Sequence, residues 1–342
     1  MENKSILTIA IPTYNRIEQL CRTLTSLIPQ LDDRCYLMIL DNNSDKNVAD
    51  EISSILNELP TTQYSVIRNG VNVGADLNIF RCFEYCHTQW LWTLSDDDEI
   101  ESDAIKTIFQ HINCYPNAIN INFYSPHVLH KKRETTEIFY GQDGLIDSID
   151  SFGANIFLSA NIYNMSLIKS FYQANRMAYS CVSQWLIILF NMQSDIFLIR
   201  SNNIIVRNVY STQKYTSINL TIINGFITLF DLPLPKHTFK KLRSKILEVD
   251  KGWIKFSHII KTLIIENKLK GNDINIKYHL KRYFYRFYKY GKKTNYFMFL
   301  LILISLYISE RMTYQILRQL IKIYKHIDIN DYMNKNNIQK FS

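Results

Sequence analysis

Three consecutive aspartates directly follow a short apolar run in residues 90–100, whose sequence is WLWTLSDDDEI. The apolar run is typical of a strand buried on both faces, and the aspartates are predicted to lie in the loop that leaves its carboxyl end. Open α/β sheets bind their ligands at that edge. Because adjacent carboxylates repel one another, they require compensation by solvent or by a cation. At the end of a buried strand the favoured partner is a hard divalent cation that carries a phosphate, and a solvated surface turn is the alternative.

Three further strand-like runs precede the acidic one, and a stretch with helical periodicity follows each of them. The strands are predicted at 6–11, 36–40 and 64–68, and the helices at 17–31, 48–59 and 75–87. The first strand is expected to stop at Pro12, because proline cannot donate to a ladder. Strands that alternate with helices predict an α/β domain with a parallel sheet and right-handed crossovers.

Polar loops follow the first, second and fourth of these strands. The carboxyl ends of parallel strands meet at one edge of a sheet, so the three loops are predicted to form one cleft. The first strand is followed by neither a Gly-x-Gly-x-x-Gly segment nor a Walker loop, which argues against a dinucleotide-binding or P-loop protein. A metal ion on the aspartates would then supply the counter-charge that a glycine-rich loop supplies elsewhere.

Four polar segments, in order along the first 100 residues, carry a family resemblance. They are IPTYNR at 11–16, DNNSD at 41–45, NVG at 72–74 with Asn78, and SDDD at 95–98. Their order and spacing resemble those of the family 2 glycosyltransferases. The resemblance implies the GT-A fold, a nucleotide-sugar-binding α/β domain whose mainly parallel sheet is flanked by helices. It also implies transfer of a sugar from a nucleotide-sugar donor with inversion at the anomeric carbon.

The resemblance assigns donor-binding roles residue by residue. Contacts with the nucleotide sugar are expected from Pro12, Thr13, Tyr14, Asn15, Asp41, Asn72, Gly74, Asn78 and Asp96. The first three would line the pocket for base and ribose, with Tyr14 packed against the base. Asp41 would accept hydrogen bonds from the base, and Asp96 would contact the ribose. Simpler roles are a cover over the sheet edge for Tyr14, a helix N-cap for Asn15 and a turn position for Asp45.

The resemblance also implies a metal site on the acidic loop. A Mn²⁺ or Mg²⁺ ion is expected on Asp97, with Asp98 as a second ligand or as a contact to the sugar. Ser95 stands where the family carries its first acidic residue, which leaves open which aspartate coordinates the ion. A bound cation would neutralise the charge that develops on the departing nucleoside diphosphate.

Inversion further requires a base that removes the proton of the acceptor hydroxyl. The resemblance places this base in the second half of the domain, where strands at 118–124 and 156–164 flank a polar stretch, 127–144, that would form an acceptor-side flap. Gln184 stands where relatives that transfer dideoxy sugars often carry histidine, and glutamine cannot act as a base. Four carboxylates are candidates, Asp143, Asp147, Asp150 and Asp195, and the base stays unassigned.

Charge divides the chain into two regions. Residues 1–235 hold 16 basic and 24 acidic side chains, a net of −8, whereas residues 236–342 hold 23 and 7, a net of +16. We therefore predict a GT-A domain at 1–230 and a helical, basic region at 231–342. An uncharged run at 297–308 is too short to span a bilayer, and its basic and aromatic neighbours suit a helix in an anionic membrane surface. The alternative is a helical subdomain that packs its apolar faces internally.

The remaining features bear on location and partners. Six cysteines at irregular spacing give no disulfide framework, and the amino-terminal residues carry no cleavage-type signal. A cytoplasmic location is therefore expected. The basic region is accompanied by no nucleic-acid recognition motif, so no nucleic-acid partner is predicted.

Together these features predict an inverting, metal-dependent glycosyltransferase, peripheral at the inner face of a bacterial cytoplasmic membrane. Its acceptor is expected to be a lipid-linked oligosaccharide in O-antigen or capsule biosynthesis, and its pattern is closest to the abequosyltransferase-like type. A nucleotidyltransferase is a second class, but it needs a glycine-rich basic loop after the first strand. A third is a non-catalytic relative that binds a sugar or nucleotide and scaffolds a membrane assembly. The donor base, the sugar, the linkage and the oligomeric state are not predicted.

Overall fold

The structure, a computed structural model, divides into two units, Met1–Thr212 and Gln213–Ser342. The residues it describes are 5–126, 128–129, 131–171, 174, 183–207, 225, 228–229, 232–249, 304, 315–316 and 319. The predicted domain boundary at 230 lies in a stretch that is described only in part, and it stays a prediction.

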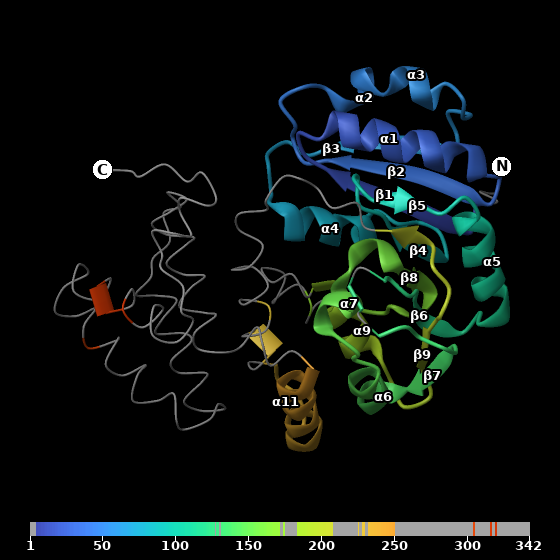
Figure 1. The fold of residues 1–342 in the computed structure, drawn as a ribbon. Helices are drawn as coiled ribbons and strands as arrows, with labels where there is room; N and C mark the ends of the chain where they lie inside the picture. The colour runs from blue at the N-terminus through green and yellow to red at the C-terminus, as the bar shows by residue number, and fades with distance from the viewer. Residues whose placement is uncertain are drawn as a thin grey trace. The chain divides into compact units, whose positions relative to one another are not determined.

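An eight-stranded mixed sheet forms the centre of the first unit (Figure 1). Its strands, in spatial order, are β3 (Tyr64–Arg68), β2 (Cys35–Asp41), β1 (Leu7–Thr13), β4 (Trp90–Thr93), β8 (Asn161–Asn164), β6 (Ala118–Asn122), β9 (Phe197–Arg200) and β7 (Glu137–Tyr140). The first four run parallel, β8 is antiparallel to both its neighbours, and β9 runs parallel to β6. A two-stranded ribbon pairs β5 (Glu99–Ile100) with β10 (Val206–Arg207). This is the GT-A-like α/β fold that the resemblance implied.

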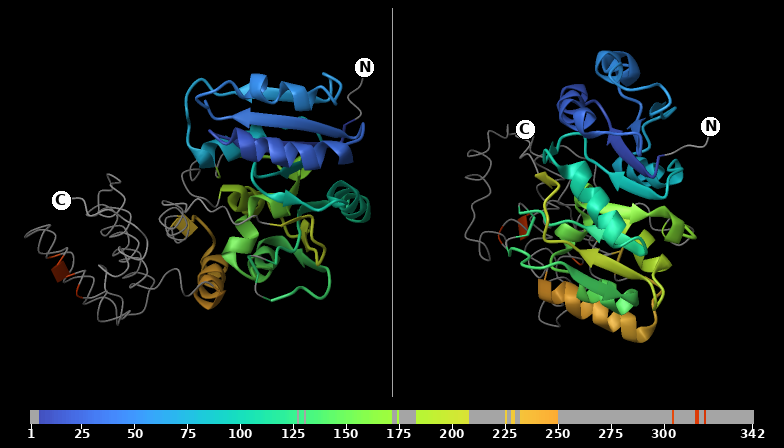
Figure 2. Two further views of the ribbon diagram at one scale, coloured as in Figure 1. Left: turned by 45° about the horizontal axis from the view of Figure 1, so that its top comes forward. Right: turned by 90° about the vertical axis from the view of Figure 1, so that its right-hand side faces the viewer.

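Helices cover both faces of the sheet (Figure 2). In the first unit they are α1 (Ile17–Leu27), α2 (Val48–Glu51), α3 (Ser53–Leu56), α4 (Ala75–Glu84), α5 (Ala104–Cys114), α6 (Gly141–Asp147), α7 (Phe152–Ile156) and α9 (Ser183–Asn191), with short 3₁₀ turns η1 (Ile28–Gln30), η2 (Leu158–Ala160) and η3 (Met165–Leu167). The apolar stripes of α1 and α5 share one core with alternate residues of β1. Helix α4 contacts β1, β2 and β4 as well as α9. Strand β4, which leads into the acidic loop, lies between these layers with both its tryptophans buried, as predicted.

The sequence analysis expected strand β1 to stop at Pro12, and this prediction is wrong. The strand continues to Thr13, where Pro12 and Thr13 pair in register with β2. The pairing with β4 ends earlier, at Ala10, whose carbonyl accepts a hydrogen bond from Leu94. The N–H that Pro12 lacks would point towards β4, as the backbone polar groups of Ala10 do. Because the pairing between β1 and β4 has already ended at Ala10, the missing N–H costs no hydrogen bond.

Two other predicted elements are shorter than expected. The helix predicted at 48–59 is two single turns, α2 and α3, because Ile52 between them has φ −105° and ψ 4° and breaks the helix. Of the strand predicted at 156–164, only β8 is extended, and its first half folds into the end of α7 and the turn η2.

The stretch predicted as an acceptor-side flap, 127–144, is anchored to the sheet by a buried arginine. Arg133 donates from Nη1 to the carbonyls of Asn122 and Ser201 at 3.0 and 3.1 Å, and from Nη2 to Asn122 Oδ1 at 2.8 Å. Its Nε contacts Asp150 at 3.0 Å. The stretch then forms β7 and enters α6, so its second half is an edge strand and a helix.

In the second unit the structure describes helix α11 (Lys236–Val249), which is amphipathic. Thr238, Leu242 and Ile246 are buried at a spacing of four residues, whereas five of the other eleven side chains of the helix are lysine or arginine. The run at 297–308 lies outside the described residues except for Ile304. Among the described residues, no helix combines the length and apolarity that crossing a membrane requires.

We expect Arg133→Ala to lower the free energy of unfolding by about 3 kcal/mol, because it leaves several buried acceptors without their donor. Urea unfolding followed by circular dichroism measures this. Lys132→Ala, which removes an exposed neighbouring cation, is the matched control and should change stability by less than about 0.5 kcal/mol. Equal stability of the two variants would show that Arg133 does not anchor this stretch.

Candidate functional site

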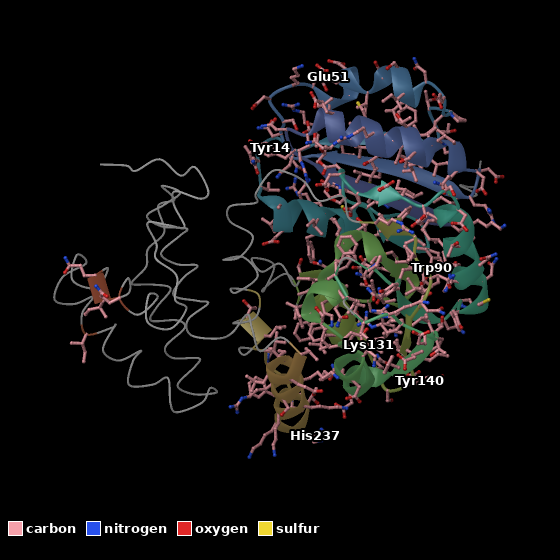
Figure 3. The ribbon with its side chains drawn as sticks, in the orientation of Figure 1. Tyr14, Glu51, Trp90, Lys131, Tyr140 and His237 are labelled. Carbon is pink, nitrogen blue, oxygen red and sulfur yellow. The ribbon has the colours of Figure 1, made fainter. Side chains whose placement is uncertain are left out.

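The carboxyl ends of β1, β2, β3 and β4 bring four polar loops to one edge of the sheet. Because these strands are parallel and adjacent, the loops at 13–16, 41–47, 69–74 and 94–98 become neighbours. Figure 3 labels Tyr14 at this edge and Trp90, the first residue of β4, towards the other. Tyr14 keeps 41% of its surface exposed. The three loops that the sequence predicted to meet at one edge therefore do so, together with the loop after β3.

Asp96 and Asp97 are held by side chains from the loop after β1. Thr13 Oγ1 donates to Asp96 Oδ2 at 2.7 Å, and Arg16 Nη1 contacts Asp96 Oδ1 at 2.8 Å. The other terminal nitrogen of Arg16 pairs with Asp97 Oδ2. Asp97 Oδ1 accepts a hydrogen bond from Ser95 Oγ at 2.6 Å. The serine that replaces the family's acidic residue thus positions Asp97.

Asp98 points to a different part of the fold. Its Oδ2 accepts a hydrogen bond from Ser159 Oγ, in η2, at 2.5 Å, and the same hydroxyl accepts from the backbone N–H of Ser95 at 2.8 Å. Asp98 is 5% exposed. In this arrangement its carboxyl joins the acidic loop to η2, and its role as a second metal ligand stays a prediction.

Burial alters the acid–base behaviour of two of the three aspartates. Burial raises the pKa of Asp98 to about 7, against the opposing hydrogen bond from Ser159. It also raises the pKa of Asp96 to about 6, although Arg16 and Thr13 stabilise the ionised form. Desolvation disfavours a charged carboxylate, which is the reason for both directions.

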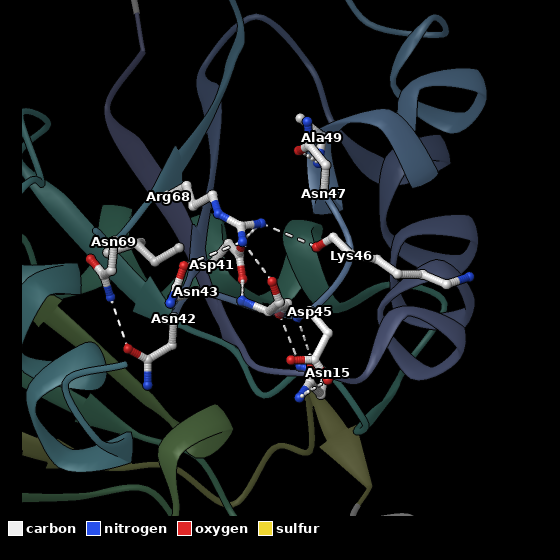
Figure 4. A network of polar contacts seen from close by, with 12 residues as sticks. Asn15, Asp41, Asn42, Asn43, Asp45, Lys46, Asn47, Ala49, Arg68 and Asn69 are labelled. Carbon is white, nitrogen blue, oxygen red and sulfur yellow. Dashed lines mark hydrogen bonds and ion pairs between the residues drawn. The ribbon is translucent and has the colours of Figure 1, made fainter. Parts of the chain in front are cut away.

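Asp41, the residue expected to face the base, is tied into the loop after β2 (Figure 4). Its Oδ1 accepts from the backbone N–H of Ser44 at 2.8 Å, and its Oδ2 contacts Arg68 Nη1 at 3.0 Å. Arg68 also donates to the carbonyls of Lys46 and Ser44. Each carboxylate oxygen can accept more than one hydrogen bond, so these contacts leave capacity for a base.

Asn15 joins the loop after β1 to the loop after β2. Its Nδ2 donates to Asp45 Oδ2 at 3.1 Å, and its Oδ1 accepts from the backbone N–H of Asp45 at 2.8 Å. Asn15 has φ +54°, a left-handed conformation that asparagine tolerates. The residue before α1 is Arg16, and no side chain caps that helix. The alternative of an N-cap role for Asn15 is therefore wrong, and its donor contact stays a prediction.

Asparagines also connect the loops after β2 and β3. Asn42 Nδ2 donates to Asn72 Oδ1 at 2.9 Å, and Asn69 Nδ2 donates to both Asn42 Oδ1 and Asn78 Oδ1. Asn78 is buried, and its Nδ2 donates to the carbonyl of Leu40 in β2. Gly74, which precedes α4, has φ +86° and nothing within 4 Å of an added Cβ, so the conformation and not space requires glycine there. These asparagines therefore form a hydrogen-bonded framework that joins the two loops to α4 and β2.

The structure separates the four candidate bases. Asp195 lies two residues before β9. Asp143 follows Gly141, whose N–H donates to the carbonyl of Ile196, so both aspartates lie near the amino end of β9. Asp147 ends α6. Asp150 lies near the carboxyl ends of β6 and β9 through its contact with Arg133. Gln184 is buried and donates to the carbonyl of Ile156 at 2.8 Å. The base stays unassigned, and the contact with Arg133 brings Asp150 to the edge of the sheet that holds the acidic loop.

The donor atoms at the acidic loop fit a divalent cation that is bound together with a phosphate. Asp97 offers hard carboxylate oxygens, and its side chain is 14% exposed, so an ion could reach it. Among the described residues, no group of three or more acidic, histidine or cysteine side chains could hold a metal. Mg²⁺-type sites with one or two carboxylates take their remaining ligands from water and substrate phosphates. The residues therefore fit a metal that arrives with a diphosphate.

Two residues of the site were given no role by the sequence analysis. Arg16 is the last residue of the segment at 11–16. Its role could have been inferred from its positive charge, because its loop is predicted to lie beside the loop that carries the three aspartates. Arg68 ends β3 and pairs in register with Asp41 of β2. Alignment of the two predicted strands would have indicated this pairing. Both arginines neutralise an aspartate at a strand end.

Comparison with known proteins supports the family resemblance over part of the chain. Residues 8–163 match the family model described as Glycosyl transferase family 2. An uncharacterised glycosyltransferase of Mycoplasma pneumoniae is 22% identical over 43% of this chain and 48% of its own length. An uncharacterised protein of Haemophilus influenzae is 26% identical over 33% of this chain and 60% of its own length. The chain spans about half the length of the curated relatives it matches.

Solved structures share the fold at low sequence identity. TarS residues 1–349 of S. aureus, in complex with UDP-GlcNAc, superpose with a TM-score of 0.56 at 14% identity, covering 85% of this chain and 89% of that one. The mannosyltransferase PcManGT of Pyrobaculum calidifontis, in complex with GDP-Man and Mn²⁺, gives 0.54 at 9% identity, with 94% and 86% covered. These likenesses show the GT-A type of fold.

We expect the ionisation of Asp98 to lower the free energy of unfolding as pH rises. A carboxyl with a raised pKa in the folded state contributes stability below pH 4, and that contribution is lost as pH rises through about 7. Asp98→Asn should therefore be more stable than the parent by roughly 2 kcal/mol at pH 8 and equal to it near pH 4. Urea unfolding in the presence of a chelator measures this.

The control is Glu99→Gln, which removes an exposed carboxylate from the same loop. It should change stability by less than about 0.5 kcal/mol at either pH. If the free energy of unfolding depends on pH in the same way for Asp98→Asn and for the parent, the pKa of Asp98 is not raised in the folded state.

Proposed function

We propose that this chain is an inverting, metal-dependent glycosyltransferase that moves a sugar from a nucleotide-sugar donor to a saccharide acceptor. The observation that carries the proposal is the acidic loop, Ser95 to Asp98, at the carboxyl end of buried β4, next to the loops that end β1 and β2. The family match over residues 8–163 includes all of these loops. The motif resemblance and the position of the loops therefore support the same site.

The loops supply complementary contacts for a nucleoside. The exposed ring of Tyr14 can pack against a base, and Asp41 can accept hydrogen bonds from it. Asp96 is fixed by Thr13 and Arg16 and can accept from a ribose hydroxyl. The UDP-GlcNAc bound to TarS and the GDP-Man bound to PcManGT support a nucleotide sugar as the donor of a protein with this fold.

Asp97 would hold the metal ion, and Asp98 is the second candidate ligand. Mn²⁺ or Mg²⁺, when bound, neutralises charge on the departing nucleoside diphosphate. The Mn²⁺ in the PcManGT complex supports the use of a divalent ion. Ser95 fixes the orientation of the Asp97 carboxylate, and a fixed ligand is needed to bring the ion to one place.

Transfer with inversion needs a base on the acceptor side of the sugar. Asp150 is the candidate that lies towards the carboxyl edge, and its side chain is 42% exposed. Its carboxylate contacts Arg133 Nε at 3.0 Å, which fixes the position of the side chain. Asp143, Asp147 and Asp195 remain candidates at other places in the first unit.

The cellular setting is proposed from charge. The net charge of +16 in residues 236–342 suits an anionic membrane surface, and helix α11 presents part of that charge beside a buried apolar stripe. A lipid-linked oligosaccharide is the matching acceptor. We place the protein at the inner face of a bacterial cytoplasmic membrane, in O-antigen or capsule biosynthesis, with an abequosyltransferase-like enzyme as the nearest type.

The second candidate function is a non-catalytic relative that binds a nucleotide or sugar and scaffolds a membrane assembly. The missing assignment of a base favours it. The positioned carboxylates of Asp96 and Asp97 favour catalysis, because a binding module has no need to hold a metal-competent acid beside a strand end.

We expect Asp97→Asn to reduce metal-dependent hydrolysis of the cognate nucleotide sugar by at least about 100-fold, because the leaving diphosphate loses its charge compensation. Release of nucleoside diphosphate from a panel of nucleotide sugars, with and without Mn²⁺, measures this. Asp33→Asn removes an exposed carboxylate elsewhere and should keep the parent rate. Unchanged hydrolysis by Asp97→Asn would remove the metal assignment, and no hydrolysis of any donor by the parent would favour the non-catalytic function.

We expect the full chain to sediment with vesicles that contain anionic phospholipid and to stay in solution with neutral vesicles. The attraction is electrostatic and should weaken as salt is raised, because the Debye length falls from about 10 Å at 0.1 M to about 3 Å at 1 M. Equal sedimentation with both kinds of vesicle at both salt concentrations would remove the proposed membrane surface.

A further inference from the structure

Arg16 forms a fork that bridges two of the three consecutive aspartates. Nη1 contacts Asp96 Oδ1 at 2.8 Å, and Nη2 pairs with Asp97 Oδ2. The side chain of Arg16 is 20% exposed, whereas those of Asp96 and Asp97 are 3% and 14% exposed. One guanidinium group therefore compensates two carboxylates that burial makes costly.

The position of this guanidinium conflicts with a metal ion on the same loop. Asp97 Oδ1 already accepts from Ser95 Oγ, and Oδ2 is the oxygen paired with Arg16. A divalent cation on either oxygen of Asp97 would lie close to the guanidinium group. Two cations held by one carboxylate at contact distance repel one another, at a large electrostatic cost.

We propose that Arg16 is a positioning residue that acts as an exchangeable counter-ion, neutralising Asp96 and Asp97 before the donor binds and releasing Asp97 to the metal when the donor's diphosphate arrives. The inference rests on the proposed function, since it takes a nucleoside diphosphate with a divalent cation as the ligand. A diphosphate is a suitable new partner for the guanidinium, because arginine binds phosphate oxygens through two parallel hydrogen bonds.

The exchange has a thermodynamic consequence. Metal alone must displace Arg16 from Asp97 without offering it another partner, so it binds weakly. Metal together with a nucleoside diphosphate offers that partner, so the two ligands bind cooperatively. Linkage requires that each ligand strengthens the other by the same factor.

A purely structural role for Arg16 predicts a different result. Arg16 precedes α1, and Thr23 of α1 donates to the carbonyl of Asp96 at 3.0 Å, so Arg16 could simply tie this helix to the acidic loop. Loss of such a tie would loosen the loop, and metal affinity would fall or stay the same. Loss of a competing counter-ion would raise metal affinity.

The test measures binding of Mn²⁺ alone to the full chain, with the electron paramagnetic resonance signal of free Mn²⁺ as readout. We expect Arg16→Ala to bind Mn²⁺ roughly tenfold more tightly than the parent, because the interaction energy of a contacting charged pair is of that order. Arg16→Lys should lie between the two, at about threefold, since an ammonium is a point charge without the fork. Arg34→Ala is the control, because Arg34 pairs with Asp32 just before β2, at the opposite edge of the sheet, and should match the parent.

Melting temperatures identify which variants fold, and Arg16→Lys decides the comparison if Arg16→Ala does not fold. Equal or weaker Mn²⁺ binding by the folded Arg16 variants, including no binding by any protein, would overturn the inference. A second arm repeats the titration with UDP, CDP, GDP or dTDP present. The factor by which the nucleotide strengthens Mn²⁺ binding should be larger for the parent than for Arg16→Ala, and an equal factor would count against the exchange.

Failure of the proposed function is distinguishable from failure of this inference. If no nucleoside diphosphate binds, the donor site is refuted, and the titration with Mn²⁺ alone still decides the role of Arg16. If nucleotides bind and Mn²⁺ affinity does not respond to Arg16, the donor site stands and the exchange is refuted.

Discussion

The compensation of carboxylates at the end of a buried strand is the constraint on which the site depends. Strand β4 is buried on both faces, so the aspartates that follow it leave the protein interior with little solvent around them. Arg16, Thr13 and Ser95 supply charge and hydrogen bonds to Asp96 and Asp97. These contacts fix the loop after β1 relative to the loop after β4. The relative position of the two loops is therefore set by the need to neutralise buried charge.

The parallel half of the fold could be predicted from sequence because its strands are short apolar runs between helical periods. β3 matches its prediction residue for residue. The errors come from context that a local pattern does not contain. Pro12 stays within β1 because the neighbouring strand has already ended on that side, and Arg133 turns a polar stretch into an anchored one through contacts with distant carbonyls. The antiparallel insertion of β8 between β4 and β6 likewise depends on pairing between segments far apart in the chain.

The site, like the fold, could be predicted from the sequence only in part. Motif residues at the strand ends were placed at one edge by topology alone, and Asp96 and Asp97 lie together there. What each side chain does depends on partners from other loops. The sequence did not indicate that the carboxyl of Asp98 accepts a hydrogen bond from Ser159, which lies far from it in the chain. Arg16 was visible in the motif, yet its bridging role requires the three-dimensional approach of the first and fourth strands.

The central claim is that the acidic loop and its neighbours form a donor site for a nucleoside diphosphate with a divalent cation. The most direct measurement is the melting temperature of the full chain with UDP, CDP, GDP and dTDP, each with and without Mn²⁺, because a ligand that binds the native state raises it. Our account predicts a rise with one of the nucleotides that requires Mn²⁺. The absence of a shift with every nucleotide, in the presence of Mn²⁺, would contradict it.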